Sequence, residues 1–146
     1  MGMKLFRQDR KVEALASTPL FAGLSKKELT ELARMTEDVT IEPGEVLCRE
    51  GELGREFFVI MDGEAEVTRK GKRLEKRGGG DFFGEIALIE DIPRTATVTA
   101  KTPVRLFVLT SRQFRPLLDD HPAIERKVLR ALAKRLLSLS RDPSLA

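Results

Sequence analysis

The spacing of apolar and polar residues divides the chain into a helical start, a strand-rich middle and a helical end. From about Arg10 to Thr36, apolar residues recur at helical spacing. Ser25 to Glu28 form a capping-box signature in front of an apolar helix face. Ser17-Thr18-Pro19 interrupts the region. We therefore expect two short N-terminal helices within residues 1–36.

Residues 37–109 alternate as β-strands do, between turns rich in glycine. Phe57–Ile60 lead into Asp62-Gly63, a dipeptide that favours a β-hairpin with the strand that follows. Lys70-Gly71-Lys72 predicts the next turn. Thr95–Ala100 alternate polar and apolar side chains, which is typical of a half-buried strand. Turns at this spacing predict a β-sandwich or barrel.

The end of the chain, residues 110–141, returns to helical spacing. Thr110 to Gln113 form a second capping box, and Pro122 suits the first turn of a longer helix. Asp142-Pro143 predicts that this helix ends there, with residues 142–146 as a tail. Its apolar stripe consists of Ile124, Val128, Leu132, Leu136 and Leu139, widened by Leu129 and Ala133.

Composition is that of a single soluble globular domain, with 146 residues, of which 41% are hydrophobic and 34% charged. No apolar run approaches the roughly 20 residues that span a bilayer. The polar stretch Met1–Arg10 does not resemble a secretory signal. Cys48 and His121 are the one Cys and the one His, which excludes an internal disulfide and a structural zinc site within one chain. We expect a cytoplasmic protein with no metal and no cofactor.

The net charge of +3 is smaller than that expected of a dedicated nucleic-acid binder. The terminal helix is nevertheless basic, because six cationic residues there accompany one acid, Glu125. A DNA-binding regulator that uses this helix is therefore one alternative, although nucleic acid is not the partner we favour. The apolar stripe of the same helix could instead form a homodimer.

The run Phe83–Leu88, followed by Pro93–Val98, carries the chemistry of the chain. Gly84 allows a sharp turn that aims backbone N–H groups at an anion, and a helical turn over Ile86–Ile89 would add donors at its N-terminus. Arg94 supplies a planar fork for two phosphate oxygens. Glu85 repels phosphate, but its carboxylate can accept hydrogen bonds from a neighbouring sugar hydroxyl. The combination predicts a site for a small phosphorylated nucleoside.

These residues closely resemble the phosphate-binding cassette of the cyclic nucleotide-binding domain family. The family pattern is Phe-Gly-Glu, an apolar residue, Ala, an apolar residue, a short loop, then Arg, a small residue, Ala and a β-branched strand. The resemblance implies a single domain over residues 1–146 with an α+β, mainly β fold. That fold is an eight-stranded antiparallel, jelly-roll-like β-roll with N-terminal helices, a short cassette helix within residues 82–98 between strands six and seven, and C-terminal lid helices.

The resemblance also implies the site. Glu85 would bind the ribose 2′-hydroxyl, Arg94 the cyclic phosphate, and the backbone amides of Ile86, Ala87 and Thr95 would complete the anion site. The full set of phosphate and ribose residues is Phe83, Gly84, Glu85, Ile86, Ala87, Arg94, Thr95 and Ala96. Taken alone, Glu85 could be a solvated surface carboxylate, and Arg94 could instead pair with Glu90 or Asp91.

On the base side, Val67 aligns with a family position that touches the base. Arg135 follows Arg94 at the spacing where several channel-type members place an Arg that caps the purine, and Leu132 and Leu136 could form an apolar lid on the same helix. Core packing is the alternative for Val67. For Arg135 the alternative is an ordinary solvated basic face.

The resemblance implies a cyclic nucleotide sensor without catalytic activity, and no nucleophile–base constellation is apparent. We expect the ligand to be cAMP. A cGMP-selective sensor is the alternative, because Thr95 resembles the residue that cGMP-selective members carry. The implied mechanism is a lid switch in which the C-terminal helices close over the base and signal to an unknown protein effector. A β-roll that responds to a protein partner rather than to a nucleotide is a further alternative.

Overall fold

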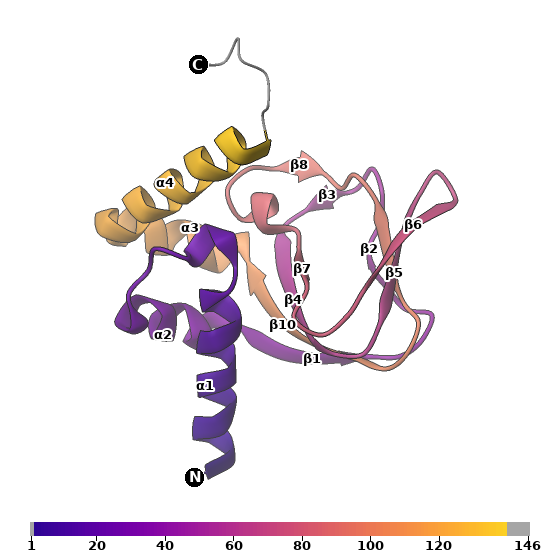
Figure 1. Cartoon of the computed structure of the whole chain (residues 1–146), viewed down its shortest axis with the longest axis horizontal. Helices are drawn as coiled ribbons and strands as arrows, with labels where there is room; N and C mark the ends of the chain where they lie inside the picture. Colours follow the sequence, from indigo (N-terminus) through magenta and orange to yellow (C-terminus); the bar gives the residue numbers. More distant parts are fainter. Residues whose placement is uncertain (1, 140–146) are drawn as a thin grey trace. The chain divides into compact units, whose positions relative to one another are not determined.

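The computed structural model describes the backbone of residues 2–139 and the side chains of residues 8–134 and 137. It consists of two compact units. One unit, the sheet unit, is Met35–Arg115. The other, the helical unit, comprises the described parts of Met1–Arg34 and Pro116–Ala146. Figure 1 shows the helices and strands of the chain, coloured along the sequence.

The strands form two four-stranded sheets and one two-stranded ribbon, with every pairing antiparallel (Figure 1). The orders are β1-β10-β4-β7, β2-β9-β5-β6 and β3-β8. The predicted antiparallel β-roll is confirmed, although the described residues form ten strand segments, three of them only two residues long. The bounds are β1 (Glu37–Ile41), β2 (Val46–Cys48), β3 (Leu53–Gly54), β4 (Glu56–Asp62), β5 (Ala65–Arg69), β6 (Lys72–Arg77), β7 (Phe82–Phe83), β8 (Ile92–Pro93), β9 (Thr97–Ala100) and β10 (Val104–Thr110).

The core of the sheet unit is built from buried residues of both four-stranded sheets. Alternation along each strand turns one set of apolar side chains inward, so the two sheets share one interior. In β9, for example, Val98 and Ala100 are buried whereas Thr97 and Thr99 are only half-buried, as predicted. The core residues are Ile41, Phe58, Ile60, Ala65, Val67, Val98, Ala100, Val104 and Leu106.

The Asp62-Gly63 turn does not close a hairpin, so that prediction was wrong. β4 pairs with β10 and β7, and β5 pairs with β6 and β9, which means that the turn carries the chain from one sheet to the other. Gly63 has a φ of 98°, and a Cβ there would overlap the carbonyl oxygen of Pro103. The glycine is therefore required by a close backbone approach as well as by the turn.

The turn predicted at Lys70-Gly71 is confirmed. It joins β5 to β6 in a hairpin, and both residues have positive φ, 52° at Lys70 and 77° at Gly71. A two-residue loop with both φ values positive matches the twist of the strands that it joins.

The helices are α1 (Gly2–Ala16), the 3₁₀ turn η1 (Pro19–Phe21), α2 (Lys26–Met35), α3 (Ser111–Asp120) and α4 (Pro122–Leu139). The first helix begins at Gly2, well before the predicted start near Arg10. The capping box in front of α2 is confirmed, because the Ser25 N–H donates to Glu28 Oε1 at 2.8 Å and the Glu28 N–H donates to Ser25 Oγ at 3.2 Å. Helix α3 starts in the sheet unit and continues into the helical unit after Arg115.

The apolar stripe of α4 is narrower than predicted. Ile124 and Val128 are buried and Leu132 is half-buried, but Leu129 is 56% exposed and Ala133 is also exposed. The helical rotation places Leu129 and Ala133 away from the buried line, so the predicted widening was wrong. The side chains of Leu136 and Leu139 lie outside the described residues. Within the part of the chain that is described, no helix has both the length and the apolarity to cross a membrane.

Candidate functional site

The cassette contains one short 3₁₀ turn, η2 (Glu85–Leu88), which starts one residue before the turn predicted from the sequence. Gly84 precedes it with a φ of 84°, a left-handed conformation that favours glycine. Inside the turn, the Ala87 N–H donates to the Gly84 carbonyl at 3.1 Å. An anion at the Ala87 amide would have to compete with this bond, and the amide contacts remain predictions.

Arg94 is nearly buried, with its side chain 9% exposed. Its Nη2 donates to the backbone carbonyl of Glu56 at 2.7 Å, and the Glu56 carboxylate lies 3.7 Å from the same nitrogen. The guanidinium carbon also lies 5.7 Å from the ring centre of Phe58, within the range of a cation–π contact. The alternative in which Arg94 pairs with Glu90 or Asp91 is therefore wrong, because its ion-pair partner comes from β4.

The two-stranded ribbon of β3 and β8 positions Arg94. β3 pairs with β8 immediately before Arg94, with Gly54 opposite Ile92. The Arg94 N–H donates to the Glu52 carbonyl, and the Gly51 N–H donates to the Arg94 carbonyl, both at 2.8 Å. Because the N–H and the carbonyl of Arg94 are both hydrogen-bonded to the segment before β4, the Cα of Arg94 is held beside Glu56.

Glu85 lies at the start of η2 and is 4% exposed. This burial excludes the alternative of an ordinary solvated surface carboxylate. Removing a carboxylate from water is costly unless other groups compensate for it, so a buried Glu in a cassette turn indicates a specific role. The sheet unit thus contains a buried acid and a nearly buried Arg within one short segment.

Thr95 and Ala96 continue from Arg94 towards β9. The side chain of Thr95 is exposed, and its carbonyl accepts a hydrogen bond from Arg69 Nε at 2.8 Å. The half-buried Ala96 places its carbonyl 3.7 Å from the thiol sulfur of Cys48. Burial raises the pKa of the Cys48 thiol, and the nearby positive charge of Arg94 partly opposes this effect.

Phe83, the first residue of the cassette motif, packs against β4. Its ring stacks on Phe58 with a centroid distance of 4.8 Å and an interplanar angle of 22°. Since Phe58 also lies near the Arg94 guanidinium, the two aromatic rings and the cation form one contiguous cluster. Packing against Phe58 therefore holds the Phe of the motif in place, and its predicted part in the ligand site stays a prediction.

The predicted base-side residues are divided between the two units. Val67 is buried in the core between the two sheets, and Leu132 is half-buried in the helical unit. The side chains of Arg135 and Leu136 lie outside the described residues. Their roles at the base stay predictions.

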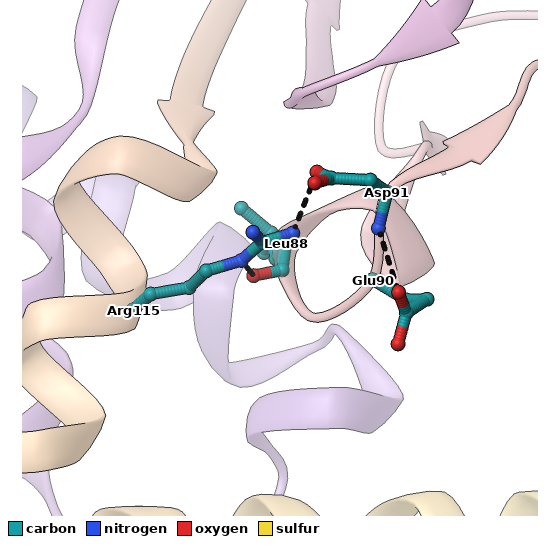
Figure 2. Close-up of polar contacts among 4 residues, drawn as sticks. All are labelled: Leu88, Glu90, Asp91 and Arg115. Carbon is teal, nitrogen blue, oxygen red and sulfur yellow. Dashed lines mark hydrogen bonds and ion pairs between the residues drawn. The ribbon is translucent and has the colours of Figure 1, made fainter.

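Arg115, which the sequence did not single out, links the end of the cassette to helix α3. Its Nε donates to the Leu88 carbonyl at 3.2 Å, and its Nη2 lies 3.0 Å from Asp91 Oδ1. The Asp91 N–H in turn donates to Glu90 Oε1 at 3.3 Å. Figure 2 shows Arg115 reaching from the helix to the loop that closes η2. Arg94 and Asp91 thus have different partners, each far away in the sequence.

Sequence reasoning also missed Glu56 and Phe58. They are separated from Arg94 by more than 35 positions, and no local pattern in the sequence indicates that they contact it. The alternation of β4 does place them on one strand face. In the described part of the chain, no group of His, Cys, Asp and Glu side chains could hold a metal ion.

Comparison with known proteins agrees with this geometry. The family model of the cyclic nucleotide-binding domain matches residues 38–121, which include the cassette, α3 and both four-stranded sheets except for the first residue of β1. The chain belongs to the cyclic nucleotide-binding domain family. This domain is regulatory rather than catalytic in the family.

Relatives carry the domain in different settings. The chain is 41% identical over 112 residues to a cAMP-dependent protein kinase regulatory subunit of Yarrowia lipolytica, which covers 73% of this chain and 30% of that protein. It is 37% identical over 131 residues to a cyclic nucleotide-gated potassium channel of Rhizobium etli, covering 88% of this chain and 37% of that protein. The chain therefore spans about a third of the length of these two relatives.

A solved structure supports the fold. The N-terminal domain of a transcriptional regulator from Streptomyces coelicolor superposes with a TM-score of 0.80 at 32% identity, covering 87% of this chain and 94% of that one. Similar domains thus occur in a kinase regulatory subunit, in a cyclic nucleotide-gated channel and in a transcriptional regulator.

Proposed function

We propose that this cyclic nucleotide-binding domain is a sensor that binds cAMP in preference to cGMP and signals through its C-terminal helices. The observation that carries the proposal is the nearly buried Arg94 guanidinium. Its one ion-pair partner among the described residues is the Glu56 carboxylate at 3.7 Å, and that carboxylate is itself 45% exposed. A cation held in this way retains N–H donors for a second, closer anion, and a cyclic phosphate supplies one.

The remaining cassette residues take complementary roles. Glu85 accepts a hydrogen bond from the ribose 2′-hydroxyl, which explains why an acid occurs beside a phosphate site. Backbone N–H groups of Ile86, Ala87 and Thr95 surround the phosphate, and Gly84 provides the turn that allows their approach. Burial of Glu85 and Arg94 supports this division of roles, because a water-poor site strengthens both interactions.

The preference for cAMP is supported by similarity to a regulatory subunit whose name states cAMP dependence. The exposed hydroxyl of Thr95 favours the alternative, a cGMP-selective site, since it could reach the exocyclic amine of a guanine. Val67, Leu132, Arg135 and Leu136 are the residues proposed for the base side.

Signalling is proposed to proceed from the cassette to α3 and then to α4, which would close over the base. Arg115 supports the first step, because it binds both the Leu88 carbonyl and the Asp91 carboxylate from the first turns of α3. The ligand can shift such an equilibrium only by its difference in affinity for the two states. The output is a protein effector of unknown identity.

Calorimetric titration with cAMP and with cGMP tests the proposal. Binding of cAMP is expected to be tighter, and Arg94→Ala should weaken it by about 2–5 kcal/mol, as for the loss of one partner of a buried charge pair. Arg105→Ala, which removes an exposed Arg from β10, is the matched control and should bind normally. Glu85→Ala should abolish the preference for the ribonucleotide over its 2′-deoxy analogue.

Absence of heat with both nucleotides would overturn the sensor proposal and favour a β-roll that responds to a protein partner. Retention on DNA that weakens with salt would instead favour a regulator that uses the basic helix α4. One cation of that helix is already engaged, because Lys127 Nζ lies 2.7 Å from Glu28 Oε1.

A further inference from the structure

The side chain of Arg94 passes between two glycines, Gly54 of β3 and Gly84 of the cassette. A Cβ built on Gly54 would overlap Nε and Cζ of Arg94 and lie 2.6 Å from its Cδ. A Cβ built on Gly84 would lie 2.5 Å from Nη1 of the same guanidinium. Since real Cβ atoms essentially never approach other heavy atoms within 3.0 Å, neither position could carry a side chain while Arg94 stays in place. We call this space the arginine slot.

The two glycines of the arginine slot are required for different reasons. Gly84 has a φ of 84°, and its Cβ would also lie 2.6 Å from the Glu56 carbonyl, so the backbone there needs glycine regardless of Arg94. Gly54 has no such φ, and the three heavy atoms nearest to its Cβ all belong to Arg94. No left-handed φ requires glycine at position 54, and the nearest obstacle to a side chain there is the side chain of Arg94.

Other glycines of the sheet unit show the contrast. At Gly63 a Cβ would collide with the backbone of Pro103 and Val104, which cannot move without disturbing the sheet. At Gly78 the nearest atom is the Gly63 carbonyl oxygen at 3.8 Å, an ordinary contact. Gly54 differs from both, because the atoms it would displace are the far end of a flexible side chain.

We infer that Gly54 is a positioning residue for the anion site. Its missing side chain lets the Arg94 guanidinium lie against β3, where Nη2 reaches the Glu56 carbonyl and the remaining N–H groups are available to a phosphate. A methyl group at position 54 displaces the cation from this place at little cost to the fold. This inference rests on the proposed binding of a cyclic phosphate by Arg94.

The experiment compares Gly54→Ala with the matched control Gly78→Ala in the full chain. In cAMP titrations by calorimetry, Gly54→Ala is expected to weaken binding about 30-fold or more, the lower end of the effect of losing a buried charge partner. Gly78→Ala should bind as the wild type does. In urea unfolding, Gly78→Ala should have a midpoint close to that of the wild type. Gly54→Ala should lower the midpoint by no more than Arg94→Ala does, because it breaks the same bond from Arg94 to the Glu56 carbonyl, whereas Gly63→Ala should unfold at clearly lower urea.

The Arg94→Ala background separates positioning from a general structural effect. There, Gly54→Ala should cause no further loss of affinity, because the group that it displaces is already absent. Wild-type affinity of Gly54→Ala, or an equal loss in both backgrounds, would overturn the inference. If Gly54→Ala fails to fold, recovery of folding in the Arg94→Ala background supports the slot, and failure in both backgrounds overturns it.

Failure of the proposed function has a different signature. In that case the wild type binds neither nucleotide, or Arg94→Ala binds as tightly as the wild type. The slot is then judged from unfolding alone, where the effects of Gly54→Ala and Arg94→Ala must be non-additive. Additive effects would overturn it.

Discussion

Replacing Arg115 by Ala should loosen the end of the cassette without changing any residue proposed to touch the ligand. Arg115 makes two contacts, one to the Leu88 carbonyl at 3.2 Å and one to Asp91 Oδ1 at 3.0 Å (Figure 2). They join the last residue of η2 and the loop that follows it to the first turns of α3. The variant therefore removes a polar link and leaves the chain connection intact.

The expected loss follows from the exposure of these groups. The side chains of Arg115 and Asp91 are 39% and 48% exposed, so their ion pair contributes only about 0.2–1 kcal/mol. The bond to the Leu88 carbonyl is partly buried but long, and contributes about 1 kcal/mol. The free energy of unfolding should thus fall by about 1–2 kcal/mol in total.

Urea unfolding of four variants measures these contributions. Asp91→Asn should lower the free energy of unfolding only by the contribution of the ion pair. The double variant with Arg115→Ala should give a coupling energy between the two side chains of about 1 kcal/mol or less. Arg112→Ala is the matched control, because Arg112 is an exposed Arg one turn earlier on the same helix. The same variants are titrated with cAMP, where a weaker affinity of Arg115→Ala is expected if the link keeps the cassette in its binding conformation.

The reasoning is refuted if Arg115→Ala unfolds at the same urea concentration as Arg112→Ala. It is refuted in part if stability falls but cAMP affinity is unchanged. The link would then stabilise the sheet unit without supporting the proposed path from cassette to helix.

Three further predictions concern other parts of the chain. Lys127, followed by the Ser25 backbone, lowers the pKa of Glu28 below its usual 4.5. The ionised Glu28 therefore stabilises the folded state fully above pH 4.5, and this stabilisation is lost as the pH falls through the lowered pKa. Urea midpoints measured from pH 7 to pH 3 should therefore fall less in Glu28→Gln than in the wild type, and parallel curves would contradict this. Because burial raises the pKa of Cys48, iodoacetamide at pH 8 should alkylate it more slowly than an unfolded control, and equal rates would show that the thiol is accessible. If the exposed Leu129 and Leu137 form a homodimer seam, Leu129→Glu should convert a dimer to a monomer in light scattering, and a monomeric wild type would exclude the seam.

Features that depend on neighbouring residues could be predicted from the sequence. The capping box at Ser25 forms with both of its bonds. In front of α3 the Gln113 N–H donates to Thr110 Oγ1 at 3.3 Å, and the Gln113 side chain accepts from the Thr110 hydroxyl at 3.1 Å, so the predicted cap forms in part. The Lys70-Gly71 hairpin is also present. Each of these features joins residues within a few positions of one another, so the chemistry that forms them is visible in the spacing itself.

Strand pairing could not be predicted in the same way. Asp62-Gly63 was interpreted as a hairpin turn, because a local signal specifies that the chain turns but not which strand lies beside it afterwards. Burial decided the outcome, since β4 and β5 each place an apolar face towards a shared core from opposite sheets.

The sequence by itself determined the residue types of the cassette: a Gly, an acid and an Arg at a spacing that indicates a phosphate and a ribose. Tertiary structure decided what surrounds them. The partner of Arg94 is Glu56, the space for its guanidinium comes from Gly54, and the end of the cassette is bound by Arg115. These contacts join segments more than 20 residues apart. The register of antiparallel strands and the packing of the core bring such segments together, and no local pattern records either of them.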